Sequence, residues 1–117
     1  MIRLRRVYDP PDPAEDGVRV LVDRLWPRGL AKAEAKVDEW PRAVTPSAEL
    51  RKWFHAGGSR EEFRARYEAE LAEPEAVAAL AHLRALAGQG TLTLVTAVRT
   101  PESSHASILA ELLTAPT

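Results

Sequence analysis

The sequence predicts an α/β protein, a small layered sandwich in which helices flank a mainly parallel sheet of about four strands. Two apolar stretches, residues 18–25 and 91–96, have the composition of buried strands. Helical patterns lie between them, and strands that are linked by helices are normally parallel with a right-handed crossover. The chain has 117 residues, which is the length of a single domain, 1–117, with one core.

The N-terminal part is predicted to contain two strands separated by a loop. Residues 2–8 alternate imperfectly between apolar and basic side chains, as in a short or edge strand. The following nine residues, DPPDPAEDG, contain three prolines, four acidic residues and a glycine, a composition typical of a loop. In the second strand, the apolar run Val20-Leu21-Val22 indicates burial on both faces, as in a central strand.

The remainder of the chain is predicted to be mostly helical. Residues 31–36 favour a helical turn, and 37–44 could be extended, although a proline within them argues against a central strand. Helices are then expected from Thr45 or Ser47 to the HAGGS stretch, over 59–72, over 74–87, and from 100 to about 113. The helix over 74–87 is predicted to turn four side chains inward: Val77, Leu80, Leu83 and Leu86.

The composition excludes several classes of function. Sixteen basic and seventeen acidic residues give a formal net charge of −1, so nucleic acid is an unlikely partner and no membrane surface is expected to bind. The absence of cysteine excludes disulfides, thiolate nucleophiles and cysteine-ligated metals, and it fits a reducing cytosol. No secretory signal and no apolar run of about 20 residues is present, so we expect a cytoplasmic protein.

Known cofactor motifs are also missing from the sequence. The three histidines, His55, His82 and His105, are scattered and form no metal-binding pattern. There is no G-x-x-x-x-G-K phosphate loop, no dinucleotide fingerprint and no G-x-S-x-G nucleophile motif. We therefore predict neither a metal nor a cofactor.

Charged side chains gather directly after two of the predicted strands. Residues 23–29 follow the second strand, and residues 97–105 connect the last strand to the last helix. In open α/β sheets, ligands bind beyond the carboxyl ends of the strands, so these two segments are expected to meet at one edge. The sequence thus predicts a binding site at this edge.

The expected partner is an anionic or phosphate-bearing small molecule. Guanidinium groups match carboxylate and phosphate oxygens, and four are predicted to hold the anion: Arg24, Arg28, Arg51 and Arg99. Trp26 would form an apolar wall, and Ser104 and the free amides at the start of the last helix would add donors. Asp23 and His105 are the candidate catalytic residues, which would orient an arginine or transfer a proton. His55 lies four residues after Arg51 and could contribute from the same helix face.

Other interpretations stay open at this level. The charged loops could serve stability alone through ion pairs, because charge clusters mark both sites and structural networks. A histidine near the start of a helix commonly bonds a neighbouring carbonyl instead of acting in catalysis. The alternative function is a nucleic-acid or protein interaction module, which would use four exposed side chains: Trp26, Arg28, Trp40 and Arg42. The sequence predicts no oligomeric state, and it leaves enzymatic activity open.

Four stretches resemble the domain of unknown function 488 (DUF488) family in its short YeaO-like branch: VYDPPDPAEDGVRVLVDRLWPRGLAK, WPRAVTPSAELRKWF, EEFRARYEAEL and TLTLVTAVRTPESSHASIL. The resemblance covers nearly the whole chain, implies an α/β fold and assigns no activity. The family pattern falls on Tyr8, Asp9, Pro10, Asp23, Arg24, Trp26, Pro27, Arg28, Gly29, Pro46, Ser47, Leu50, Arg51, Trp53, Phe54, Phe63, Tyr67, Leu71 and His105. Relatives often carry asparagine or cysteine before this histidine, where the present chain has Ser104, so a cysteine-based mechanism cannot operate here.

Overall fold

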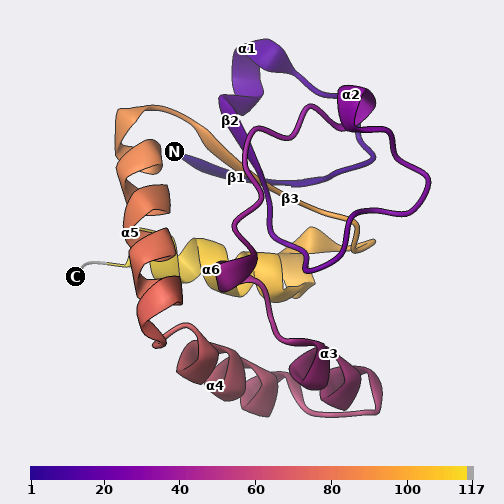
Figure 1. Cartoon of the computed structure of the whole chain (residues 1–117), viewed down its shortest axis with the longest axis vertical. Coiled ribbons are helices and arrows are strands. Elements are labelled where there is room, and N and C mark those ends of the chain that lie inside the picture. Colours follow the sequence, from indigo (N-terminus) through magenta and orange to yellow (C-terminus); the bar gives the residue numbers. More distant parts are fainter. Residues whose placement is uncertain (116–117) are drawn as a thin grey trace.

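A computed structural model, which describes residues 1–115, contains one sheet of three parallel strands (Figure 1). The strands are β1 (Ile2–Arg6), β2 (Val18–Leu21) and β3 (Leu92–Thr96), and their spatial order is β1-β3-β2. The mixed helix and sheet class and the parallel arrangement are confirmed. The described residues form three strands in this sheet, however, and not about four.

The segment after β2 lies beside the sheet without forming a fourth strand. One parallel bridge joins Val20 to Glu39, and the Leu21 amide donates to the Glu39 carbonyl at 3.0 Å. Pro41 follows and has no amide hydrogen to continue a ladder, and the chain turns into a 3₁₀ helix, η1 (Arg42–Val44). β2 is therefore an edge strand, and the prediction of a central position was wrong. Its apolar character is explained by burial on both faces of the sheet, with Val20 in one apolar cluster and Leu21 in the other.

Within the described residues, six α-helices connect or flank the strands. They are α1 (Pro13–Asp16), α2 (Lys32–Ala35), α3 (Ala48–His55), α4 (Arg60–Glu70), α5 (Pro74–Gln89) and α6 (His105–Thr114), with a 3₁₀ helix, η2 (Pro101–Ser103), before the last. Ser47, Ser59 and Ser104 precede α3, α4 and α6, and each hydroxyl accepts a hydrogen bond from a first-turn amide. The last helix thus begins at His105 and not at residue 100, because Pro101 opens the 3₁₀ turn instead.

The pleat of the sheet separates two apolar clusters. One face is covered by α3 to α6, and it buries alternate strand residues such as Val20 and Leu94. The opposite face packs Leu21 and Val95 against α2 and the loop that contains Trp26. In Figure 1, α5 and α6 lie against the sheet, while α3 and α4 form a hairpin below it. The site described below lies where this hairpin approaches the carboxyl ends of the strands.

The inward face of α5 differs from the predicted one at a single position. Ala76, Leu80 and Leu83 are buried, whereas Val77 is 51% exposed. The buried residues are spaced by four and three positions and share one side of the helix, from which Val77 is rotated by about 100°. No helix within the described residues, α5 included, is long and apolar enough to cross a membrane.

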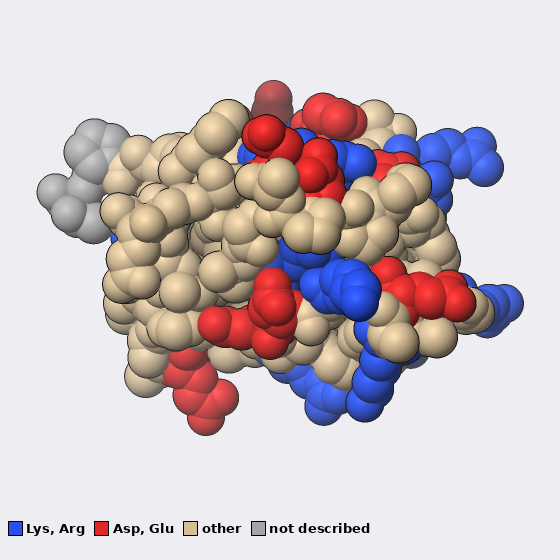
Figure 2. Space-filling model, turned by 90° about the horizontal axis from the view of Figure 1, so that it is seen from above, with Lys and Arg blue, Asp and Glu red and all other residues tan. Residues whose placement is uncertain are grey.

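A buried carboxylate forms ion pairs with arginines at the amino ends of the strands. Asp16 is fully buried, and its oxygens lie 2.7 Å from Arg19 Nη1 and 3.2 Å from Arg3 Nη1. Burial alone would raise the pKa of Asp16, but hydrogen bonds from the Asp12 amide and Arg19, with the nearby positive charges, lower it overall. Arg3 and Arg19 therefore stabilise the fold. Seen from above, acidic and basic side chains are interspersed on the surface (Figure 2).

Candidate functional site

Two segments that are distant in sequence meet at the carboxyl end of the sheet. β2 and β3 are parallel neighbours, so the residues that follow them leave the sheet from the same edge. Asp23, after β2, and His105, at the start of α6, are hydrogen-bonded, with 3.0 Å between Oδ1 and Nε2. The two segments converge as the sequence predicts.

A cavity of about 340 Å³ lies between these segments and the α3–α4 hairpin. Five of the predicted site residues line it: Asp23, Arg24, Arg51, Ser104 and His105. Its other lining side chains are mostly apolar or aromatic, and they include residues of α3 and α4. The cavity thus combines a charged side with an apolar side.

Asp23 is held in place by three hydrogen-bond donors. Oδ1 accepts from the Thr96 hydroxyl at 2.7 Å and from His105, and Oδ2 accepts from the Ala97 amide at 2.8 Å. Burial alone would raise the pKa of Asp23, but the hydrogen bonds from His105, Thr96 and Ala97 lower it overall. Asp23 is therefore an anion at neutral pH, and its oxygens are engaged by these donors and not by the arginines of the cavity.

The hydrogen-bond partners of His105 determine which ring nitrogen carries a proton. Nε2 lies 3.0 Å from the Val22 carbonyl oxygen and 3.0 Å from Asp23 Oδ1. Both of these oxygens can only accept, so Nε2 must be the donor. Nδ1 makes no hydrogen bond within residues 1–115. It can accept a hydrogen bond from a ligand when the ring is neutral, and it donates one to an anion when the ring is protonated.

Two arginines of the cavity have no carboxylate partner in the described part of the chain. Arg51, half-buried on α3, makes no side-chain hydrogen bond and no ion pair there. Arg24 makes one long contact, 3.4 Å from Nη1 to Thr45 Oγ1. By contrast, Arg3 and Arg19, at the amino ends of the strands, each form an ion pair with Asp16. The charged lining of the cavity therefore includes two guanidinium groups, one of them on the exposed Arg24, against one engaged carboxylate.

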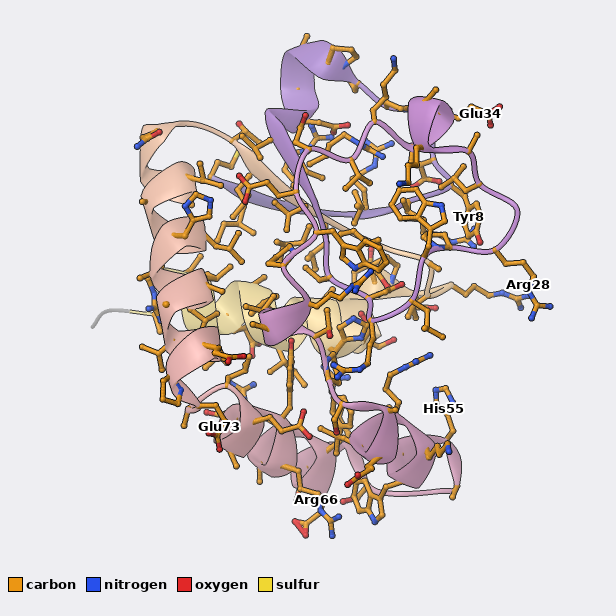
Figure 3. The ribbon with its side chains drawn as sticks, in the orientation of Figure 1. Tyr8, Arg28, Glu34, His55, Arg66 and Glu73 are labelled. Carbon is orange, nitrogen blue, oxygen red and sulfur yellow. The ribbon has the colours of Figure 1, made fainter. Side chains whose placement is uncertain are left out.

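Three predicted ligand-binding residues do not line the cavity. Trp26 donates its indole N–H to the Leu30 carbonyl at 2.7 Å, and its ring packs edge-to-face on Trp40. Arg28 is exposed and points away from the body of the protein (Figure 3). Arg99 is exposed as well. Asp23 and Arg24 reach the cavity because they follow β2 closely. Trp26, a few residues later, packs on the opposite face of the sheet, with Leu21 and Val95.

The start of the last helix offers few free donors. The Ser103 and Ser104 amides donate to the carbonyls of Thr100 and Pro101, both at 3.1 Å. The Ser104 hydroxyl donates to the Pro101 carbonyl at 2.8 Å and accepts from the Ala106 amide. The available donors of the cavity are therefore mainly the arginine and histidine side chains.

Comparisons with known proteins decide the family. A family model described as the inactive DUF488-N3 subclade matches residues 1–117. Uncharacterised proteins of Mycobacterium tuberculosis and Mycobacterium bovis are each 49% identical over 113 residues, which cover 96% of this chain and 92% of theirs. The uncharacterised protein YeaO of Escherichia coli is 43% identical over 113 residues, 96% of both chains. The chain belongs to the DUF488 family.

Membership in DUF488 confirms the resemblance of the sequence motifs. No solved structure matches this DUF488 chain. The motif stretches supply much of the cavity lining, because VLVDRLWPRG contains Asp23 and Arg24, and PSAELRKWF contains Pro46, Arg51 and Phe54. Stretches that carry the family resemblance thus converge on one cavity.

The sequence interpretation missed the apolar side of the DUF488 cavity. Phe54 and Phe63 both line the cavity, and Phe63 is also buried in the core. Val98 lines it from the loop after β3. The available signal was the position of Phe54 three residues after Arg51, on the helix face that also carries His55. Within residues 1–115, no three His, Cys, Asp or Glu side chains are grouped so that they could hold a metal ion.

Proposed function

We propose that this protein binds a small anionic molecule, a carboxylate or a phosphate ester, in the cavity at the carboxyl end of the sheet. The observation that carries the proposal is the guanidinium of Arg51, half-buried in the cavity without an anionic partner in the described chain. A partly desolvated cation without a partner costs free energy, which a bound anion would offset. Arg24 supplies a second cation, and the free Nδ1 of His105 supplies a further polar contact.

The proposed role is binding and not catalysis. The family model that matches the chain describes an inactive subclade. The chain has no cysteine, and the two serine hydroxyls that line the cavity, those of Ser103 and Ser104, already donate to backbone carbonyls, so neither is an activated nucleophile. In this role, the hydrogen bond that His105 Nε2 donates to Asp23 holds the ring in one tautomer and leaves Nδ1 for the ligand.

A nucleic-acid or protein interaction module is less well supported. The indole N–H groups of Trp26 and Trp40 donate to backbone carbonyls, and the two rings pack on each other at 5.5 Å. The guanidinium of Arg42 lies over the Trp40 ring, 4.1 Å from its centroid. These rings stabilise the loop after β2 and are poorly suited as free stacking platforms. Figure 2 also displays acidic side chains among the basic ones on its face, a mixture that disfavours a polyanion.

Titration with inorganic phosphate and with succinate tests the proposal, with thermal unfolding and calorimetry as readouts. A ligand that binds only the folded form raises its melting temperature. Arg51→Gln should weaken binding by about tenfold or more, because a charge-assisted hydrogen bond contributes about 1.5–3 kcal/mol. Arg28→Gln is the matched control, since it removes the same charge from an exposed side chain outside the cavity. Equal losses in both variants, or no response of the unmodified protein to either anion, would overturn the proposal.

A further inference from the structure

Arg51 shares one face of α3 with an aromatic ring. Phe54 and His55 follow Arg51 at three and four positions, so the three side chains project from the same side of the helix. All three line the cavity. Because the Cβ atoms of such neighbours lie about 5–6 Å apart, an anion bound by Arg51 would have the Phe54 ring beside it.

Part of the apolar lining of the cavity is open to solvent. Phe54 packs on the buried Phe63, with 4.4 Å between ring centroids and 34° between the ring planes. Phe54 itself is only half-buried, so part of its ring surface is not covered by protein. Val98, from the loop after β3, lines the same cavity and is 38% exposed. Two separate elements thus present uncovered apolar surface next to the cationic side chains.

The cavity is also larger than a simple anion requires. Its volume of about 340 Å³ lies at the lower end of the range of about 300–1,000 Å³ found for pockets that hold organic ligands. A water molecule accounts for only about 30 Å³ of liquid volume. A bare carboxylate or phosphate would therefore leave the surfaces of Phe54 and Val98 in contact with water.

From these observations we infer that the ligand carries an aromatic ring next to its anionic group, as in an aromatic carboxylate or an aryl phosphate. The inference rests on the proposed function, since it places the anion at Arg51. The ring lies against Phe54 in an offset-stacked or edge-to-face arrangement and has Val98 as a second apolar contact. Binding removes these surfaces from water, which adds affinity beyond the contribution of the anion.

Two matched pairs of probes test the inference: phenyl phosphate against methyl phosphate, and benzoate against acetate. Calorimetry or ligand-observed NMR should show that the ring-bearing member of each pair binds about tenfold more tightly or better. Phe54→Leu keeps an apolar side chain and removes the ring. It should reduce the preference for phenyl phosphate over methyl phosphate severalfold.

A second variant avoids any effect on the core. Val98→Ser alters an exposed loop side chain and should also reduce the preference for the ring-bearing probes. Val77→Ser is its matched control, because Val77 is an exposed valine on α5 that does not line the cavity. This control should retain the preference in full, and circular dichroism verifies that all variants are folded.

The possible outcomes separate this inference from the proposed function. Equal affinity for both members of each pair overturns the inference and leaves anion binding at Arg51 intact. Failure of all four probes to bind overturns both. A preference that survives in both Phe54→Leu and Val98→Ser places the ring elsewhere and likewise overturns the inference.

Discussion

Asp23 and His105 are 82 residues apart in the sequence and share a hydrogen bond of 3.0 Å between Oδ1 and Nε2. The same Oδ1 accepts from the Thr96 hydroxyl at the end of β3, and Oδ2 accepts from the Ala97 amide. One carboxylate therefore joins the loop after β2, the end of β3 and the first residue of α6. It stabilises this edge of the sheet and also orients the histidine ring in the cavity.

Asp23→Asn should lower the free energy of unfolding by about 1.5–3 kcal/mol, because an amide cannot accept hydrogen bonds from all three donors. Urea unfolding measures the change. Asp9→Asn is the control, since the Asp9 side chain is 41% exposed, and its change should stay within about 0.5 kcal/mol. Equal stability of Asp23→Asn and the unmodified protein would show that the carboxylate does not tie these segments together.

Acid should destabilise the protein through Asp16 and Asp23. Both carboxyl groups have a pKa below the ordinary value of 3.8, so the folded state binds protons less readily than the unfolded chain. Their contribution to stability is therefore complete above the pKa of the unfolded chain and is lost as the pH falls through the lower folded values. Urea unfolding as a function of pH should show a decline below about pH 4. The decline should be smaller in Asp16→Asn, and an identical decline would contradict this assignment.

Ser47→Ala should cost more stability than Ser59→Ala, although both serines begin helices. Each hydroxyl accepts a hydrogen bond from the amide three residues later, at 3.1 Å and 3.2 Å. Ser47 additionally donates its amide and its hydroxyl to the Glu70 carboxylate at the end of α4. We expect a loss of about 1 kcal/mol for Ser59→Ala and about 2 kcal/mol for Ser47→Ala.

Urea unfolding of the two serine variants gives this comparison directly. Because α3 carries Arg51, Ser47→Ala should also weaken phosphate binding, whereas Ser59→Ala should not. Losses of equal size would show that the bond to Glu70 adds nothing to the cap.

Gly17→Ala and Gly88→Ala should change the melting temperature in opposite directions. Gly88 lies within α5, where an added Cβ meets no atom within 4 Å, so alanine should stabilise by about 0.5–1 kcal/mol. Gly17 has a φ of +60°, and an added Cβ would lie 2.1 Å from the Thr91 carbonyl oxygen. That oxygen accepts from the Val18 amide and cannot move freely, so the loss should exceed about 2 kcal/mol. A stabilising Gly17→Ala would contradict this description of the turn.

Part of the site could be predicted because the side chains that follow neighbouring parallel strands leave the sheet at one edge. This rule brought Asp23 and His105 together correctly. It could not distinguish Arg24, which lines the cavity, from Arg28, which points into solvent. That choice depends on how Trp26 packs against Trp40 and donates to the Leu30 carbonyl, and neither contact has a signature in the local sequence.

The α/β class, the parallel strands and the start of α4 at Ser59 were predictable from the sequence, because spacing, composition and neighbouring residues encode these features locally. Tertiary packing sets three further features of residues 1–115: the sheet has three strands, α6 begins at His105, and Arg51 has no carboxylate partner. These features depend on which hydrogen-bond donors and acceptors from distant segments pair with one another. That pairing is set only when the whole chain is packed.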